Sequence, residues 1–224
     1  MTLAIFDLDN TLIAGDSDHR WGEYLCERGL ADPALHKKEN DRFYADYNRG
    51  SLDIGAYLRF ALGPIAGMTI AEVATLQQDF VGNCIEPMLL TKAFSLLEAH
   101  RQQGHTLLII SATNTVVTGP IAERLGVTHL IGSDAEIVSG CYSGRPIGTP
   151  AYREGKVTRL FDWLKNRPEE LIDDAWFYSD SHNDLPLLSL VDHPVVVDPD
   201  PTLAAHAATK EWPVISLRDQ PLRT

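Results

Sequence analysis

The stretch AIFDLDNTL, residues 4–12, sets a short apolar run directly against two carboxylates. The run from Leu3 to Phe6 is typical of a strand buried on both faces, whereas Asp7 and Asp9 repel each other and are costly to remove from water. Two interpretations stay open on this stretch alone. The Asp residues cap a following helix, or the two carboxylates share a divalent cation.

Five more short apolar runs, each bounded by polar or turn residues, recur along the chain. They are residues 106–110, 128–133, 175–179, 194–198 and 212–216. Helical patterns separate most of them, at residues 92–104, 119–126 and 155–166. This alternation predicts an α/β fold whose core is a Rossmann-like doubly wound parallel sheet, with helices on both faces and right-handed crossovers.

One segment breaks the alternation. Residues 14–84 contain no convincing strand and indicate several helices. A crossover needs only about a dozen residues, so this segment is far longer than a connection requires. We therefore expect a core domain of residues 1–13 and 85–224, with residues 14–84 inserted as a small helical domain. The stretch EIVSGCYSG, residues 136–144, predicts a hairpin that adds a flap to the sheet.

The composition narrows the class of protein. The chain has 224 residues, 44% hydrophobic and 22% charged, which is ordinary for a globular protein. Its formal net charge of −12 disfavours nucleic acid as a partner but allows a small anionic substrate, since a metal and a lysine can reverse the field in one cleft. Cys26, Cys84 and Cys141 match neither a zinc site nor a disulfide framework, and favour a reducing compartment.

The apolar runs also bear on location and partners. No basic leader precedes Asp7, and no apolar stretch approaches the length of a membrane span. We therefore expect a cytoplasmic protein that does not bind membranes. Nothing in the sequence requires an obligate protein partner, so we expect a monomer or a homodimer.

Polar side chains follow three of the predicted strands. Asp7 and Asp9 follow the first strand, Ser111 follows the second, and Asp180 follows the fourth, with Asp184 four residues later. Because ligands bind outside the carboxyl ends of parallel strands, we expect these side chains to meet in one crevice. Four carboxylates there require a cation, and oxygen ligands favour Mg²⁺, which accepts a substrate phosphate as a further ligand. This convergence favours the metal over the helix cap.

The neighbouring residues suit a phosphate. Ser111 offers a hydroxyl, and the SATNT stretch, which includes Ala112, offers backbone N–H groups where the next helix is expected to begin. Lys156 supplies positive charge from the start of another helix. A carboxylate beside a metal-bound phosphate can attack phosphorus, and a second acid can protonate the leaving alcohol and then activate water. On this reasoning Asp7 is the nucleophile and Asp9 the general acid/base.

The stretches DLDNT, SATN, GK and SDSHND, in this order, resemble the four motifs of the haloacid dehalogenase-like superfamily over nearly the whole chain. The place of the insert is similar to that in the phosphoserine-phosphatase-like branch, subfamily IB, which implies a C1-type cap. The resemblance implies a phosphatase with Asp7 as nucleophile and Asp9 as acid/base. It implies Mg²⁺ held by Asp7, the Asp9 backbone carbonyl and Asp180, with Asp184 in support. The residues it implies for phosphate contact or stabilisation are Ser111, Lys156 and Asn183.

Substrate choice is expected to come from the insert, which closes over the crevice as a lid. The stretch AGDSDHRWGEY begins the insert and offers five candidate residues: Asp16, Asp18, His19, Trp21 and Glu23. The acids suit a cationic amine, and His19 or Trp21 suits a ring. An ordinary solvated helix face explains the same pattern, and both interpretations stay open.

The resemblance also bears on the substrate. The stretches FDLDNTLIAGDSDHRWGEYL and YSDSHNDLPLL look similar to bacterial members of the branch that hydrolyse histidinol phosphate, which implies that small metabolite as the substrate. Phosphoserine is the alternative, although the Phe- and Arg-containing cap signature of phosphoserine enzymes is not found. Ser179 stands where the family pattern has a glycine. A phospho-accepting signalling switch is the competing class, but such receiver domains are much shorter and lack the helical insert.

Overall fold

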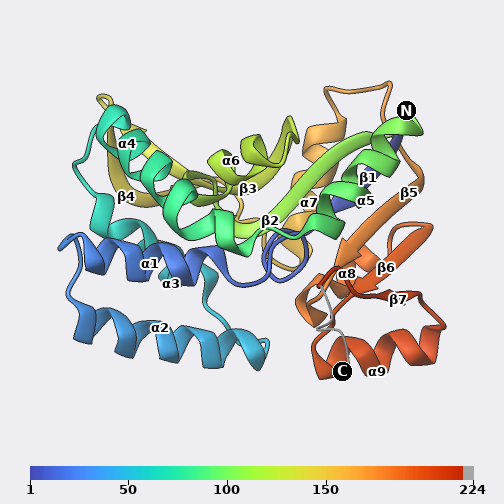
Figure 1. Ribbon diagram of the computed structural model, residues 1–224, viewed down its shortest axis with the longest axis horizontal. Coiled ribbons are helices and arrows are strands. Elements are labelled where there is room, and N and C mark those ends of the chain that lie inside the picture. The colour runs from blue at the N-terminus through green and yellow to red at the C-terminus, as the bar shows by residue number, and fades with distance from the viewer. Residues whose placement is uncertain (219–224) are drawn as a thin grey trace.

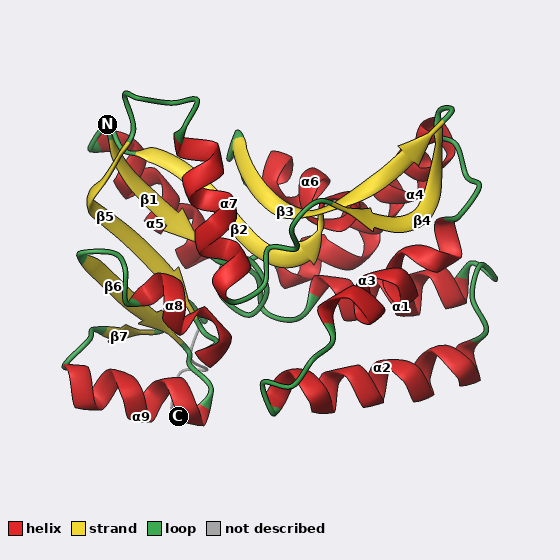
Figure 2. Cartoon of the chain, turned by 180° about the vertical axis from the view of Figure 1, so that it is seen from behind, coloured by secondary structure: helices red, strands yellow, loops and turns green. Residues whose placement is uncertain are grey.

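The structure, a computed structural model, describes residues 1–218 and has a seven-stranded sheet at its centre. The strand order is β4-β3-β2-β1-β5-β6-β7 (Figures 1 and 2). The strands are β1 Thr2–Phe6, β2 Thr106–Asn114, β3 His129–Val138, β4 Cys141–Ile147, β5 Leu171–Ser179, β6 His193–Val197 and β7 Val214–Ile215. Neighbouring strands pair in parallel except for the antiparallel pair β3 and β4. The predicted α/β class is confirmed, and each predicted strand is present.

Strand β1 shows why the sheet is covered on both faces. Ala4 and Phe6 belong to one hydrophobic cluster, and Leu3 and Ile5 belong to another. Successive side chains of a strand point to opposite faces, so both faces of β1 are buried. Apolar side chains of α5 Thr91–Gln102 and α6 Thr115–Arg124 join the first cluster, and those of α7 Glu154–Leu164, α8 Leu185–Leu188 and α9 Pro201–Lys210 join the second. This is the predicted doubly wound arrangement.

Four helices lie between β1 and α5, in the part of the chain that was expected to be the insert. They are α1 Ser17–Glu27, α2 Pro33–Asn48, α3 Ile54–Leu62 and α4 Ile70–Phe80, and short helical turns follow at Gly63–Ile65, Val81–Ile85 and Glu86–Met88. Each of the four begins after a residue whose side chain accepts a hydrogen bond from the backbone N–H three residues on: Asp16, Asp32, Asp53 and Thr69. Such caps satisfy N–H groups that have no partner within the helix.

The inserted helices pack directly on the core. Trp21 of α1 and Phe80 of α4 join the hydrophobic cluster beneath one face of the sheet. Helix α2 lies beyond α1 and α3, on their side away from the sheet (Figures 1 and 2). The chain enters and leaves the insert where Ile13 pairs with Leu89 in an isolated antiparallel bridge. The division of the chain into a core and a cap of residues 14–84 stays a prediction.

Strands β3 and β4 form the predicted hairpin. Ser139 and Gly140 have positive φ angles of 52° and 82°, as in the tight two-residue turns that match the twist of a sheet. The paired strands extend beyond the predicted stretch of residues 136–144. The Tyr142 backbone N–H donates to the Met68 carbonyl at 2.9 Å. The hairpin therefore holds the connection between α3 and α4.

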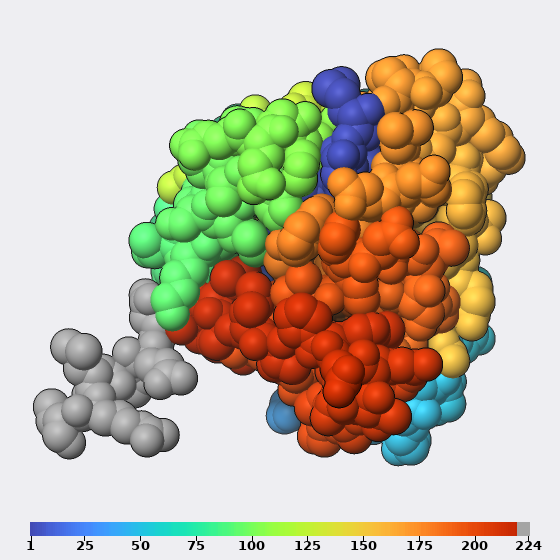
Figure 3. Space-filling model, turned by 90° about the vertical axis from the view of Figure 1, so that its right-hand side faces the viewer, coloured from blue at the N-terminus to red at the C-terminus, as the bar shows by residue number. Residues whose placement is uncertain are grey.

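The amino end of β1 reaches the surface beside the segment that precedes β5 (Figure 3). There the Leu171 N–H donates to the Met1 carbonyl at 3.0 Å. The carboxyl end of β1 is buried, and the residues predicted to be functional follow it. No helix within residues 1–218 combines the length and the apolar content needed to cross a membrane.

Candidate active site

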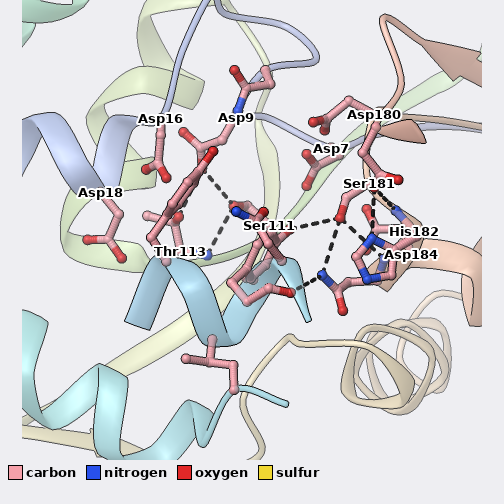
Figure 4. Close-up of a pocket in the computed structure, with 18 of the residues that line it drawn as sticks. Asp7, Asp9, Asp16, Asp18, Ser111, Thr113, Asp180, Ser181, His182 and Asp184 are labelled. Atoms are coloured by element: carbon pink, nitrogen blue, oxygen red, sulfur yellow. Dashed lines mark hydrogen bonds and ion pairs between the residues drawn. The ribbon is translucent and has the colours of Figure 1, made fainter. Parts of the chain in front are cut away.

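A cavity of about 570 Å³ opens at the carboxyl ends of β1, β2 and β5 (Figure 4). These three strands are adjacent, with β1 in the middle, so the residues that follow them are brought to one place. The lining includes every residue predicted for catalysis, phosphate binding or metal binding: Asp7, Asp9, Ser111, Ala112, Lys156, Asp180, Asn183 and Asp184. The predicted convergence is therefore present in the structure, while the chemical roles of these residues stay predictions.

Lys156 lies at the bottom of the site, with only 3% of its side chain exposed. Its Nζ atom donates to Asp7 Oδ1 and to Asp184 Oδ2, each at 2.7 Å. Ser179 Oγ also donates to Asp184 Oδ2, at 2.7 Å. The serine that replaces the usual glycine therefore holds Asp184 in place. These contacts fix the orientation of the Asp7 carboxylate.

Gly155 allows Lys156 to enter the site from the first turn of α7. A Cβ atom at residue 155 would overlap the carbonyl oxygen of Pro150. That oxygen belongs to the backbone and cannot rotate away, so the loop and the start of α7 can approach this closely only at a glycine. The GK pair in the sequence thus has a structural reason as well as a chemical one.

Asp9 faces away from Lys156, toward the end of β2. Its Oδ2 atom accepts a hydrogen bond from Thr113 Oγ1 at 2.9 Å, and its Oδ1 atom accepts from the Ser17 backbone N–H at 2.6 Å. Burial raises the pKa of Asp9 to about 6, and repulsion from Asp16 adds to the effect. A carboxyl group with this pKa can hold or release a proton near neutral pH, as a general acid/base must.

The other carboxylates outnumber the positive charge beside them. Lys156 forms ion pairs with Asp7 and Asp184, whereas Asp180 forms no ion pair with a Lys or Arg side chain of residues 1–218. Burial raises the pKa of Asp7 to about 7 even though Lys156 lowers it, and burial with repulsion from Asp7 and Asp184 raises the pKa of Asp180 well above its ordinary value. For Lys156, burial lowers the pKa, but Asp184 and Asp7 outweigh burial and raise it.

This excess of buried negative charge suits a divalent cation. The donors are oxygen atoms, as Mg²⁺ prefers, and Thr11 Oγ1 orients the Asp180 carboxylate through a hydrogen bond of 3.1 Å. In the described part of the chain no group of three or more His, Cys, Asp or Glu side chains is arranged so that it could hold a metal ion by itself. A site built from two carboxylates, a backbone carbonyl, waters and a substrate phosphate is compatible with that finding, because Mg²⁺ retains several waters.

Asn183 uses both ends of its amide to join the core to α2. Its Oδ1 atom accepts from the Tyr152 hydroxyl at 3.0 Å, and its Nδ2 atom donates to the Tyr47 carbonyl at 3.3 Å. The Tyr47 hydroxyl donates to Ser181 Oγ at 2.9 Å. Asn183 therefore positions the insert over the cavity. The contact predicted between Asn183 and phosphate stays a prediction.

The five candidates for substrate specificity separate into two groups. Asp16, Asp18 and His19 line the cavity, whereas Trp21 and Glu23 do not. Trp21 is 2% exposed and packs edge-on against Phe80, so it belongs to the core rather than to a substrate pocket. The Glu23 side chain is 52% exposed and forms ion pairs on the surface of α1. The geometry of the cavity gives no support to these two residues as substrate contacts, and their role in specificity stays a prediction.

The next helix begins at the last residue of the SATNT stretch, Thr115, so the earlier residues of the stretch do not belong to it. Strand β2 continues to Asn114, so α6 begins at Thr115 and Ala112 lies three residues before it. The Thr113 N–H donates to Ser111 Oγ at 3.1 Å, which makes a tight turn-like end to the strand. The backbone N–H groups predicted to bind phosphate therefore belong to the end of β2 rather than to a helical turn.

Several lining residues were not predicted. Tyr47 comes from α2 and Tyr57 from α3, and the spacing of aromatic residues in RFYADYN was the available signal for the former. Arg218 also lines the cavity, with its Nη2 atom 3.4 Å from Asn10 Oδ1. These two residues are 208 positions apart, and no local pattern connects them.

Comparisons with known proteins agree with this geometry. Residues 4–189 match the haloacid dehalogenase-like hydrolase family. A histidinol-phosphatase from Neisseria meningitidis serogroup C (strain 8013) is 45% identical over 219 residues, which cover 96% of this chain and 99% of that protein. The phosphoserine phosphatase SerB1 from Mycobacterium tuberculosis (strain ATCC 25618 / H37Rv) is 31% identical over 218 residues, which cover 96% of this chain and 70% of that protein.

Solved structures share the fold. A protein of unknown function from Bordetella pertussis Tohama I has a TM-score of 0.89 at 40% identity, and the match covers 97% of this chain and 100% of that one. A substrate-bound phosphoserine phosphatase has a TM-score of 0.69 at 17% identity, over 99% of this chain and 95% of that one, which is a likeness of fold. With the four motifs meeting in one cavity, this chain belongs to the haloacid dehalogenase-like hydrolase family, as one of its phosphatases.

Proposed function

We propose that this protein is a Mg²⁺-dependent phosphomonoesterase that hydrolyses histidinol phosphate through a phosphoryl group carried on Asp7. The proposal rests mainly on the position of Asp7. Lys156 fixes its carboxylate at the carboxyl ends of the three adjacent strands β2, β1 and β5. A fixed and partly neutralised carboxylate beside a phosphate is a competent nucleophile.

In the first step an Asp7 oxygen attacks phosphorus, and the bond from phosphorus to the ester oxygen breaks. Asp9 gives its proton to that oxygen, so the substrate leaves as a neutral alcohol. In the second step a water attacks phosphorus and gives a proton to Asp9, which frees inorganic phosphate and restores the Asp7 carboxylate. The hydrogen bonds from Thr113 and Ser17 hold Asp9 beside the end of β2 while it performs both transfers.

The remaining residues bind the phosphate and balance its charge. Ser111 and the backbone at Ala112 line the cavity at the end of β2, and in this proposal they donate hydrogen bonds to the phosphate oxygens. Mg²⁺, held by the carboxylates of Asp7 and Asp180 and by the Asp9 carbonyl, with Asp184 in support, would supply the positive charge that lets a phosphate approach these acids. Lys156, at the bottom of the site, also helps to balance the negative charge of the phosphate and of the acids that it contacts.

The insert of residues 14–84 acts in this proposal as the cap. Helix α2 approaches the core through the Tyr47 hydroxyl, which bonds to Ser181 beside Asp180. Residues of α1, α2 and α3 then complete the wall of the cavity. A cap in this position excludes water from the phosphate and presents side chains to the rest of the substrate.

Histidinol phosphate is favoured as the substrate by the relative with that activity in its name, which is 45% identical and spans almost all of both chains. Phosphoserine is the second candidate, supported by the relative that is 31% identical and named for that activity. Phosphate release from the two esters, measured with Mg²⁺ present, separates the candidates. We expect a higher kcat/KM for histidinol phosphate, and a preference for phosphoserine would contradict this choice of substrate.

The competing class, a phospho-accepting switch, predicts a different outcome. A switch would retain the phosphoryl group on Asp7 without sustained release of phosphate. Steady release of phosphate from either ester, abolished by Asp7→Asn, supports the enzyme. A persistent phosphoprotein with no turnover supports the switch.

A further inference from the structure

Asp18 is a buried acid that faces the substrate side of the cavity. It lies in the first turn of α1, lines the cavity and is 6% exposed. The Tyr57 hydroxyl donates to its Oδ2 atom at 2.8 Å, and Asn114 Nδ2 donates to its Oδ1 atom at 3.2 Å. Figure 4 shows Asp18 and Asp16 on the side of the cavity opposite Asp180. Asp18 is therefore fixed in place, away from the predicted metal ligands.

Asp18 has no counter-ion within the described residues. Lys156 neutralises Asp7 and Asp184, but no Lys, Arg or His of residues 1–218 forms an ion pair with Asp18. Burial raises the pKa of Asp18 to about 8, and repulsion from Asp16 adds to the effect. A carboxylate can accept about four hydrogen bonds, and residues 1–218 supply two donors to Asp18. Without a ligand the Asp18 carboxyl group therefore holds its proton at neutral pH. A positively charged group bound beside it would favour loss of that proton, and the Asp18 oxygens retain acceptor capacity for such a group.

The wall of the cavity around Asp18 also favours a positively charged ligand. The described residues of α1, α2 and α3 that line the cavity include neither Lys nor Arg, and their one basic residue, His19, is held by Asn40 and Glu23 rather than by Asp18. The ring of Phe43 packs edge-on against Tyr57, with 5.3 Å between centroids, and both rings line the cavity near the Asp18 contact. Aromatic rings attract cations, and an acid without a basic partner repels carboxylates. This wall suits a ligand with a positive nitrogen and no carboxylate.

The other acids of α1 are less suited to this task. Asp16 Oδ1 accepts the His19 backbone N–H at 2.9 Å, so this carboxylate is already used as the cap of α1. Glu23 lies outside the cavity and is paired on the surface. Asp18 is the acid of α1 that is both buried and part of the cavity lining.

We propose that Asp18 determines substrate class by binding the positively charged nitrogen of an amino-alcohol phosphate, while the wall around it disfavours esters that carry a carboxylate. This inference rests on the proposed function and adds to it the residue that selects the substrate. It separates histidinol phosphate, which has positive nitrogens and no carboxylate, from phosphoserine, which has both.

The test compares three esters on four proteins. The esters are histidinol phosphate, its analogue without the amino group and its analogue with a phenyl ring in place of the imidazole. The proteins are the wild type, Asp18→Asn, Tyr57→Phe and the control Glu23→Gln, whose acid lies outside the cavity. The measured quantity is the ratio of kcat/KM for histidinol phosphate to that for each analogue, and thermal unfolding first establishes that each variant is folded.

In the wild type we expect at least one of these ratios of kcat/KM to exceed about tenfold, because losing a hydrogen bond to a charged group changes binding by about that factor or more. Asp18→Asn should reduce that ratio to within about threefold of unity, and Glu23→Gln should leave it unchanged. The analogue whose ratio collapses identifies the nitrogen, ammonium or imidazole, that Asp18 binds. Tyr57→Phe keeps the acid but loosens it, so we expect a partial reduction, mainly through KM.

The outcomes distinguish this inference from the proposed function. If the wild type releases phosphate from none of the esters with Mg²⁺ present, the proposed function fails. If the wild type is active and its ratios are the same in Asp18→Asn, the inference fails alone. If Asp18→Asn does not fold, Tyr57→Phe decides the question. Unchanged ratios in Tyr57→Phe overturn the inference. An increase in KM for histidinol phosphate, without an increase for the analogue that lacks the bound nitrogen group, supports it.

Discussion

Replacing Lys156 with methionine tests the charge balance of the site. Methionine keeps most of the apolar stem but leaves Asp7 and Asp184, both buried, without the cation that contacts each at 2.7 Å. Removing one partner of a buried ion pair costs about 3–5 kcal/mol. For a chain of this length each kcal/mol lowers Tm by about 2–4 °C, so we expect Tm to fall by about 6–20 °C at pH 8.

The same substitution predicts a dependence on pH. Burial already raises the pKa of Asp7 to about 7, and removal of Lys156 would raise it further. A protonated carboxyl group carries no uncompensated charge, so the loss of stability should shrink as the pH falls below this pKa. We therefore expect a smaller fall in Tm at pH 5 than at pH 8.

The assay is thermal unfolding followed by circular dichroism in a chelating buffer, so that no divalent cation replaces the missing charge. Lys165→Met is the matched control, because the Lys165 side chain is 73% exposed and its pair with Asp162 is on the surface. We expect the control to change Tm by less than about 2 °C. A fall of the same small size for Lys156→Met, or an equal fall at both pH values, would refute the reasoning.

Three further predictions concern neighbouring residues. Burial raises the pKa of Asp18 to about 8, so the folded state keeps a proton that the unfolded state loses, and the stability of the wild type declines as the pH rises toward 8. The Tm of Asp18→Asn relative to that of the wild type should therefore increase from pH 5 to pH 9. A difference in Tm that stays constant over this range would contradict the prediction. Mg²⁺ at about 100 times its dissociation constant should stabilise the wild type by about 2.7 kcal/mol, visible as a rise in Tm, and Asp180→Asn should lose most of that rise. A Cβ at residue 155 meets the Pro150 carbonyl, so Gly155→Ala should lower both Tm and kcat, and a variant with wild-type values would show that the loop relaxes without cost.

The part of the site on the core was accessible from sequence because parallel strands impose it. Asp7 and Asp180 each follow a short apolar run, and adjacent parallel strands bring their carboxyl ends together whatever the intervening chain does. Lys156 was predicted from its place at a helix start. Its depth in the structure follows from Gly155 and Pro150, and no sequence pattern states that close approach.

The part of the site on the insert was less accessible. Trp21 was proposed as a substrate contact because it lies in the stretch that begins the insert and suits a ring, but the apolar residues Trp21, Tyr24 and Leu25 form one stripe of α1 that packs into the core. The spacing of that stripe was the available signal. Tyr57 reaches Asp18 only through the packing of α3 beside α1, a tertiary contact that the local sequence does not encode.

One helix carried no prediction. Helix α9 begins after Asp200, whose Oδ1 atom accepts the N–H groups of Thr202 and Leu203, each at 2.8 Å. An Asp cap followed by Pro201 in the first turn is a recognisable start, and the alanine-rich stretch behind it favours a helix. The missed helix therefore reflects a pattern that was present but not used.

The central claim, that Asp7 carries the phosphoryl group, is tested most directly by chemical trapping. The protein is mixed with Mg²⁺ and histidinol phosphate, quenched in acid during turnover and digested, and the peptides are analysed by mass spectrometry. We expect a phosphoryl adduct on the peptide that contains Asp7, more of the adduct in Asp9→Asn because its hydrolysis is slowed, and none in Asp7→Asn. Sustained turnover without any adduct, or an adduct on another residue, would contradict this claim.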